Sequence, residues 1–356
     1  ATLTITAGAG STVEVFDGTT SLGTATETAT AGTYSFTPSL ADGAYSLTAK
    51  ATDAAGNASE ASDALSFTLD STAPAKPTVA LSTDSGSSDT DGITSAATLT
   101  ITAEAGSTVE VFDGTTSLGN AIESTETAGT FTFTASPALT DGAYSLTAKA
   151  TDAAGNESEA SDALSFTLDS TAPAKPTVAL STDSGSSDTD GITSAATLTI
   201  TAEAGSTVEV FDGTTSLGTA TETATAGTFS FTASSALTDG AYSLTAKAAD
   251  AAGNASEASD ALSITLDATK PVAPTVVLSA TTGISTTLTI AAEAGSTVEV
   301  FSGTESLGNA TESTEAGTFT FTPSFTEDGT YSFTTVATDG AGNESEASAA
   351  ASFLRD

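Results

Sequence analysis

The chain has 356 residues, of which 45 are acidic and 7 are basic, and it contains no His, Cys, Met or Trp. The lack of His and Cys excludes a Ser-His-Asp triad, a thiol nucleophile, a zinc finger and an iron–sulfur centre. The formal net charge of −38 argues against binding to nucleic acid or an anionic membrane, and no apolar run is long enough for membrane insertion, so cations are the partners that such a surface attracts.

Four copies of one sequence unit follow one another along the chain. The motif ATLTIT begins at Ala1, Ala97 and Ala196, and the related motif TTLTIA begins at Thr286. A spacing of roughly one hundred residues is too long for a solenoid repeat and is typical of a small domain. The sequence therefore predicts four tandem domains.

Segments that contain proline mark the boundaries between these domains. Each segment follows a Leu-Asp that ends an apolar alternation, and proline stiffens such a connection. The predicted domains, called repeats 1 to 4 below, are residues 1–70, 71–169, 170–267 and 268–356. Repeat 1 has no counterpart of residues 71–96. A window cut from a longer array is the simplest interpretation, and a strand donated by another chain is the alternative.

Apolar residues alternate with Thr and Ser inside each repeat, and this period of two indicates half-buried strands. In repeat 2, for example, Leu99 and Ile101 alternate with Thr98, Thr100 and Thr102. Turn residues such as Asp-Gly separate the alternating segments. About seven strands are expected in repeat 2, around residues 78–81, 97–103, 109–111, 117–118, 131–133, 144–148 and 164–168.

This number of short strands favours an immunoglobulin-like sandwich, and the pattern also fits a fibronectin type III layout. The predicted fold class is all-β, with tandem immunoglobulin-like β-sandwich domains in an extended head-to-tail array. Tyr45, Tyr144, Tyr242 and Tyr331 each follow an Asp-Gly turn at the start of the sixth strand. That position indicates a tyrosine corner, and an ordinary core aromatic is the alternative.

Strand order predicts which loops share an end of each sandwich. The Asp-rich loop after the first strand, residues 84–92 in repeat 2 and 183–191 in repeat 3, and the Leu-Asp after the last strand share the C-terminal end. The Glu-Ala-Gly-Ser and TDAAGN loops share the N-terminal end. Stacked repeats would therefore gather oxygen ligands at each junction. The candidates are Asp70 with Glu104, Asp152 and Asn156 at the first junction; Asp84, Asp89, Asp91 and Asp169 with Glu203, Asp250 and Asn254 at the second; and Asp183, Asp188, Asp190 and Asp267 with Glu293, Asp339 and Asn343 at the third.

Carboxylates this crowded repel one another, and a hard cation reverses the sign of that interaction. Carboxylate, amide and backbone oxygens suit Ca²⁺, whereas soft transition metals prefer His or Cys and Mg²⁺ keeps its waters. The sequence therefore predicts Ca²⁺ at the junctions between domains. The Asp-rich loop is not an EF-hand, and Asp, Ser and Gly also form ordinary turns, so a turn without metal is the alternative.

Repeat 4 departs from the other copies. Residues 280–283 replace its Asp-rich loop, Ser302 stands where the other repeats have Asp, and Ala349 stands where they have Asp63, Asp162 and Asp260. Repeat 4 is therefore expected to accept metal from repeat 3 but to bind it weakly, if at all, at its own C-terminal end.

Three longer segments carry a specific resemblance. They are TAEAGSTVEVFDGTTSLG, LTDGAYSLTAKATDAAGNESEAS and LDSTAPAKPTVAL. They resemble the bacterial Ig-like repeats of large secreted adhesins, which include biofilm-associated proteins of the Bap type and type I-secreted adhesins with RTX tails. The resemblance covers all four repeats. It implies an extracellular stalk on the bacterial cell surface, stiffened by Ca²⁺ at the junctions, whose partners are neighbouring Ig-like domains of the same chain.

The leading functional hypothesis is therefore a structural stalk and not an enzyme. A self-assembling S-layer or matrix filament is the alternative, although the acidic surface disfavours it unless cations bridge the chains. A glycan-binding module is less favoured, because Trp is absent and most Phe and Tyr fall on the inward phase of the strands.

Overall fold

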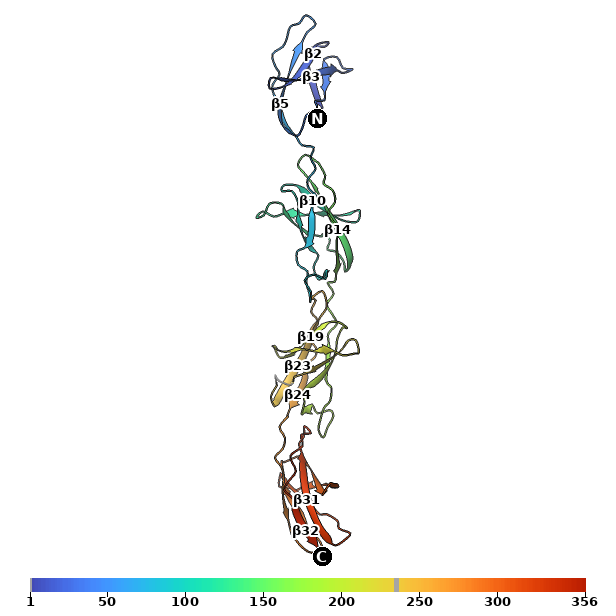
Figure 1. Cartoon of the computed structure of the whole chain (residues 1–356), viewed down its shortest axis with the longest axis vertical. Helices are drawn as coiled ribbons and strands as arrows, with labels where there is room; N and C mark the ends of the chain where they lie inside the picture. Colours follow the sequence, from blue (N-terminus) through green and yellow to red (C-terminus); the bar gives the residue numbers. More distant parts are fainter. Residues whose placement is uncertain (1, 234–236) are drawn as a thin grey trace. The chain divides into compact units, whose positions relative to one another are not determined.

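The computed structural model describes residues 2–233 and 237–356, and all regular secondary structure within them is β-strand (Figure 1). The all-β prediction is therefore confirmed. No helix in this part of the chain has the length and apolar character needed to cross a membrane. The chain forms two compact units, Ala1–Asp84 with Ala96–Leu168, and Ser85–Ser95 with Asp169–Asp356. The second unit thus contains residues 85–95 of repeat 2, which include most of its Asp-rich loop, together with repeats 3 and 4.

Repeats 1 and 2 contain the first strands of the chain. Those of repeat 1 are β1 (Leu3–Thr6), β2 (Thr12–Asp17), β3 (Thr20–Glu27), β4 (Thr33–Phe36), β5 (Gly43–Thr52) and β6 (Leu65–Leu69). Those of repeat 2 are β7 (Thr78–Leu81), β8 (Ile93–Thr94), β9 (Thr98–Thr102), β10 (Thr108–Asp113), β11 (Thr116–Asn120), β12 (Ile122–Glu123), β13 (Thr130–Thr134), β14 (Gly142–Thr151) and β15 (Leu164–Leu168).

Repeats 3 and 4 contain the strands that follow. Those of repeat 3 are β16 (Thr177–Leu180), β17 (Ile192–Thr193), β18 (Thr197–Thr201), β19 (Thr207–Asp212), β20 (Thr215–Thr219), β21 (Thr221–Glu222), β22 (Thr228–Thr232), β23 (Gly240–Ala249) and β24 (Leu262–Leu266). Those of repeat 4 are β25 (Thr275–Leu278), β26 (Leu288–Ala291), β27 (Thr297–Ser302), β28 (Glu305–Asn309), β29 (Thr311–Glu312), β30 (Thr318–Phe321), β31 (Gly329–Thr338) and β32 (Ala351–Arg355).

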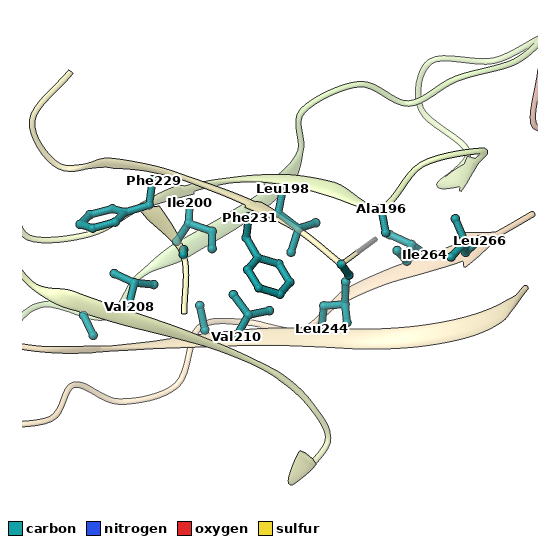
Figure 2. Packing of buried hydrophobic residues seen from close by; sticks show 14 residues of the cluster. Ala196, Leu198, Ile200, Val208, Val210, Phe229, Phe231, Leu244, Ile264 and Leu266 are labelled. Carbon is teal, nitrogen blue, oxygen red and sulfur yellow. The ribbon is translucent and has the colours of Figure 1, made fainter. Parts of the chain in front are cut away.

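Repeat 3 is a sandwich of two sheets, with the strand orders β16-β18-β22-β21 and β17-β24-β23-β19-β20. Leu198, Ile200 and Phe229 come from the first sheet and face Val208 and Val210 of the second sheet (Figure 2). All five side chains are buried. The alternation of apolar residues with Thr and Ser places every second side chain in this core and leaves the hydroxyl groups on the outer faces.

Repeats 2 and 4 follow the same plan. In repeat 2, β12-β13-β9-β7 form one sheet and β11-β10-β14-β15 are consecutive neighbours in the other. In repeat 4 the orders are β25-β26-β30-β29 and β28-β27-β31-β32. The strands expected from the sequence are all present. The sequence did not predict the two-residue strands, because they lack room for a recognisable alternation.

Repeat 1 forms a single six-stranded sheet, β1-β4-β3-β2-β5-β6. The sheet is continuous because β3 pairs with both β2 and β4. In repeat 2, β7 pairs with β9 so that Val79 is opposite Ile101. Within the described residues, β1, the counterpart of β9, pairs only with β4. A surface hollow lined by Leu3, Ile5 and Leu47 runs beside this edge. Repeat 1 therefore exposes part of the core that β7 covers in repeat 2.

The tyrosine hydroxyls confirm the tyrosine corner. Each donates to the backbone carbonyl oxygen four residues upstream, which ties the start of the strand to the preceding turn. The bonds are Tyr45 to Ala41 at 2.7 Å, Tyr144 to Thr140 at 2.6 Å, Tyr242 to Thr238 at 2.6 Å and Tyr331 to Glu327 at 2.9 Å.

Candidate functional site

The Asp-rich loop of repeat 3 runs between β16 and β17 and is held against the last strand of the same repeat. Strand β17 pairs in parallel with β24, and the backbone N–H groups of Thr265 and Asp267 donate to the carbonyl oxygens of Gly191 and Thr193, at 2.8 and 3.0 Å. The loop and the Leu-Asp at the end of repeat 3 therefore lie together, as the strand order predicted.

Hydrogen bonds to its own backbone shape this loop. The Gly191 N–H donates to Oδ2 of Asp183 at 2.9 Å, and the Ile192 N–H donates to Oδ1 of Asp190 at 3.0 Å. Sequence reasoning missed Thr193, which is fully buried and whose hydroxyl donates to the Ala195 carbonyl at 3.2 Å. Thr carries no charge and is common in the strands of this chain, so no sequence signal distinguishes this one.

Asp183 is the member of the loop with the most unusual surroundings. Its Oδ1 is buried and has no hydrogen-bond partner within the described residues. A buried carboxylate oxygen without a donor is costly, because it has lost water and gained nothing in exchange. A cation is one group that removes this cost, so the donor chemistry fits a hard metal ion.

Asp188 and Asp190 line the same surface hollow as Asp183. Both are exposed. Within residues 2–233 and 237–356, no group of three or more acidic side chains is close enough together to hold a metal ion. The three aspartates are thus brought to one hollow but not into a coordination shell, and the ligand set stays a prediction.

The corresponding residues of repeat 2 have a similar local environment. Asp84 is half-buried, whereas Asp89 and Asp91 are exposed. Oδ1 of Asp91 accepts the Ile93 N–H at 2.9 Å, as Asp190 does in repeat 3. In repeat 4 a backbone hydrogen bond takes the place of the bond to the Asp carboxylate. The Gly283 N–H donates to the Leu354 carbonyl at 3.1 Å. Residues 280–283 thus keep the strand pairing without any carboxylate.

The carboxylates of the TDAAGN turns already have donors. In repeat 4, Oδ1 of Asp339 accepts the Asn343 N–H at 2.8 Å, and Oδ2 accepts the Asn343 side-chain amide at 2.9 Å. Asp152 with Asn156 and Asp250 with Asn254 make the same pair of bonds. These hydrogen bonds, above all the one from the Asn156 side chain, lower the pKa of Asp152 below its ordinary value.

The asparagine of each turn also reaches the preceding repeat. The Asn343 Nδ2 donates to the backbone carbonyl of Asp267 at 2.8 Å, and Asn254 donates to the Asp169 carbonyl at the same distance. Asn156 makes the equivalent bond to Asp70 at 3.2 Å. The structure thus shows the side-chain nitrogens as donors, and the predicted role of the side-chain oxygens as metal ligands stays a prediction.

The remaining predicted ligands are placed as follows. Oδ1 of Asp70, Asp169 and Asp267 accepts the backbone N–H two residues later, at 3.1 Å in each case. The side chains of Glu104, Glu203 and Glu293 are exposed, and their carbonyl oxygens accept the N–H of Ser107, Ser206 and Ser296 in tight turns. The structure thus brings the Leu-Asp of one repeat to the Asn of the next, while the Glu residues serve their own turns through the backbone.

Comparison with known proteins identifies the repeats. A family model described as a bacterial Ig-like domain matches residues 1–71, 72–170, 171–268 and 279–356. Exoglucanase B of Cellulomonas fimi is 37% identical over 174 residues, which cover 46% of this chain and 15% of the exoglucanase. The matched region is therefore a small part of that protein.

Two solved structures are also similar. The fibronectin(III)-like modules of Clostridium thermocellum CbhA share 17% identity with a TM-score of 0.34, covering 51% of this chain and 94% of theirs. A Ca²⁺-stabilized adhesin that helps an Antarctic bacterium reach out and bind ice shares 21% identity with a TM-score of 0.31, covering 100% of this chain and 94% of that one. The family match extends over nearly the whole sequence, and this chain belongs to the bacterial Ig-like domain family.

Proposed function

We propose that this chain is a calcium-stiffened stalk segment of a bacterial cell-surface or biofilm adhesin. One observation carries the proposal. Oδ1 of Asp183 is buried without a donor in the described residues, at the end of repeat 3 where the Asp267 carbonyl accepts a hydrogen bond from Asn343 of repeat 4. A carboxylate oxygen whose burial a cation would compensate therefore lies beside the contact between two repeats.

The residues that would hold the ion are Asp183, Asp188 and Asp190. When bound, Ca²⁺ would supply positive charge and accept several oxygen ligands at once. The residues of the chain do the rest. Asp183 keeps one oxygen on the Gly191 N–H and presents the other, while Asn343 orients the turn of repeat 4 on the Asp267 carbonyl. Extracellular calcium modules bind at about 10⁻⁴–10⁻³ M, so such a site fills outside the cell and empties in the cytosol.

The location of the predicted ligands within each repeat supports the stalk role. Every side chain assigned to the predicted site belongs to a loop or turn at the end of a repeat. A cation at such a position restrains the angle between repeats. The motifs shared with large secreted adhesins support the cell-surface setting.

Small-angle X-ray scattering of the full chain tests the proposal. The maximum dimension should increase when Ca²⁺ replaces a chelator, and an equal concentration of Mg²⁺ should have a smaller effect. The combined variant Asp84→Asn and Asp183→Asn should lose most of the increase. Asp63→Asn, which neutralises an exposed acid in repeat 1, is the matched control and should behave as the unmodified chain does.

Two outcomes count against the stalk. A maximum dimension that is the same with Ca²⁺ and with chelator contradicts stiffening. Calcium-dependent oligomers in analytical ultracentrifugation would favour the alternative of a self-assembling S-layer or matrix filament.

A further inference from the structure

A serine in the Asp-rich loop of repeat 3 contacts the TDAAGN-type turn of repeat 4. The Ser184 hydroxyl donates to the backbone carbonyl of Ala341 at 2.6 Å. The same Oγ accepts the Ser194 N–H at 2.8 Å. The Ser194 N–H of repeat 3 thus orients the Ser184 hydroxyl, and the proton of this hydroxyl is donated to repeat 4. Both groups belong to the same compact unit of the chain.

The next residue, Gly185, approaches the same turn too closely for a side chain. It has a φ of +102°, and a Cβ built on it would come closer than 3.0 Å to the carbonyl oxygen of Gly340. A Cβ on Gly342 would lie 2.9 Å from the backbone nitrogen of Gly185. The two backbones therefore meet directly, which only glycine permits at these positions.

The Asp-rich loop of repeat 2 makes the same contacts with repeat 3, within the same compact unit. The Ser85 hydroxyl donates to the Ala252 carbonyl at 2.6 Å, and a Cβ on Gly86 would overlap the Ala251 carbonyl. Residue 251 is Ala where residue 340 is Gly, so the contact depends on the backbone carbonyl and not on that side chain.

The turn of repeat 2 provides an internal comparison. Ala252 and Ala341 are 0% and 1% exposed beneath the Ser-Gly pair. Ala154 is their counterpart in repeat 2, and it is exposed. Repeat 1 contributes no Asp-rich loop from this chain to cover it. This alanine is therefore buried in repeats 3 and 4, where a Ser-Gly pair contacts the turn, and exposed in repeat 2, where this chain provides no such pair.

We propose that Ser184-Gly185 and the turn Asp339–Asn343 form a docking joint that holds repeats 3 and 4 together without metal. The joint consists of a hydroxyl-to-carbonyl hydrogen bond, two facing glycines and one buried alanine. It recognises a bacterial Ig-like repeat by the backbone of its Ala-Gly-Asn turn. Repeat 4 has Ala280–Gly283 in place of the loop and so cannot dock a further repeat in this way. Repeat 1, whose turn Asp53–Asn57 exposes Ala55, can accept the Ser-Gly loop of another repeat.

Double electron–electron resonance, which measures the distance between two spin labels, tests the joint between repeats 3 and 4 of the full chain. The chain has no Cys, so Thr214→Cys and Thr304→Cys place two labels at exposed, equivalent hairpins without side reactions. The distance distribution of this doubly labelled chain should already be narrow in chelator because of the joint, and Ca²⁺ should narrow it further. Gly185→Ala should broaden it at least twofold, with and without Ca²⁺, and Ser184→Ala should broaden it less.

Gly283→Ala is the matched control for backbone strain. Gly283 has a φ of +122° in the corresponding segment of repeat 4, but no atom lies within 4 Å of its built Cβ. This variant should keep the narrow distribution. A thermal melt of each variant separates loss of the joint from loss of the fold.

The result also separates the joint from the calcium site. A distribution that is narrow in chelator and broadened by Gly185→Ala supports the joint whether or not Ca²⁺ has an effect. A distribution that is broad in chelator, or that Gly185→Ala leaves unchanged, overturns it. If the distribution then narrows only with Ca²⁺, the proposed calcium role stands without the joint.

Discussion

Lys175 Nζ lies 2.6 Å from Oδ1 of Asp260, so that the proline-containing segment at the start of repeat 3 is tied to the loop before its last strand. Lys76 and Asp162 make the same pair in repeat 2. In repeat 4 both partners are replaced by alanine, at Ala273 and Ala349. Asp162 and Asp260 therefore form salt bridges with the lysines, and repeat 4 lacks both the aspartate and the lysine.

This salt bridge is expected to contribute little stability. The Lys175 and Asp260 side chains are 44% and 96% exposed, and water screens such a pair. A double-mutant cycle of Lys175→Ala and Asp260→Ala, measured by urea denaturation, should give a coupling energy of about 0.2–1 kcal/mol. The coupling should fall further at high salt. A coupling above about 2 kcal/mol would mean that the pair is far less solvated than its exposure indicates.

The core of repeat 3 should be far more sensitive. Leu198 is 0% exposed between the two sheets, so Leu198→Ala should lower the free energy of unfolding of this repeat by about 2–5 kcal/mol. Val277, on β25 of repeat 4, is 64% exposed, and Val277→Ala should change stability by no more than about 0.5 kcal/mol. Hydrogen exchange of the amides in each repeat provides the measurement. Equal effects of the two variants would contradict the burial assigned to these residues.

Asp183 should affect stability in opposite ways with and without calcium. In chelator, Asp183→Asn removes the charge of a half-buried carboxyl group whose Oδ1 has no donor in the described residues, so the melting temperature should stay the same or rise. With Ca²⁺ present, the unmodified chain should gain stability from binding and the variant should gain less. Differential scanning calorimetry in the two buffers checks both signs. A variant that is destabilised in chelator would show that the Asp183 carboxylate contributes structural bonds beyond the one that Oδ2 accepts from Gly191.

Asp152 should depend on its asparagine for its low pKa. Because the Asn156 side-chain hydrogen bond is the largest cause of the lowered value, Asn156→Ala should raise the pKa of Asp152 toward the ordinary value of 3.8. A pKa that is lower in the folded state adds stability above the unfolded value, and this contribution is lost as the pH falls through the folded pKa. The turn of repeat 2 should therefore loosen only below about pH 3.8.

Carbon-13 NMR titration of the Asp152 carboxyl group measures this pKa directly. Asp53 in repeat 1 has the same arrangement with Asn57, and its pKa is lowered for the same first cause. It is the control in the Asn156→Ala chain and should not change. An Asp152 pKa that also stays unchanged would assign the shift to the backbone N–H donors.

The exposed edge of β1 should accept a strand in trans. A peptide with the sequence of residues 75–82 would place its Val opposite Ile5 and its Leu opposite Leu3, by the register that Val79 and Leu81 have with Ile101 and Leu99. Binding should shift the NMR signals of β1 and raise the stability of repeat 1. The same peptide with Asp in place of Val and Leu is the control. Equal shifts with both peptides would argue against strand addition.

Much of this architecture could be predicted from residues near one another in the sequence. The alternation of Leu99 and Ile101 with threonines indicates a strand because a side-chain period of two is a local property of the extended backbone. The repeated motifs indicate four domains for the same reason, since each copy carries the same local pattern. The position of Tyr144 after its Asp-Gly turn likewise predicted the corner that its hydroxyl makes with Thr140.

The candidate site could be predicted only in part. Strand order placed the Asp-rich loop beside the Leu-Asp end, and the structure agrees, through the bond from the Asp267 N–H to the Thr193 carbonyl. The sequence could not tell which carboxylates already have donors. Asp339 and Asp183 are both aspartates in loops, but each oxygen of Asp339 accepts a hydrogen bond from Asn343 whereas Oδ1 of Asp183 is buried without a donor in the described residues.

By itself, the sequence determined the all-β class, the four repeats, the acidic surface and the absence of any nitrogen or sulfur metal ligand from His or Cys, since composition and local period are sufficient for these. Only the tertiary structure decided that the Asn343 amide is a donor to Asp267, 76 residues away, and that the backbones of Gly185 and Gly340 meet. Hydrogen-bond partners and close approaches depend on distances between residues far apart in the chain, and those distances exist only once the sheets have packed.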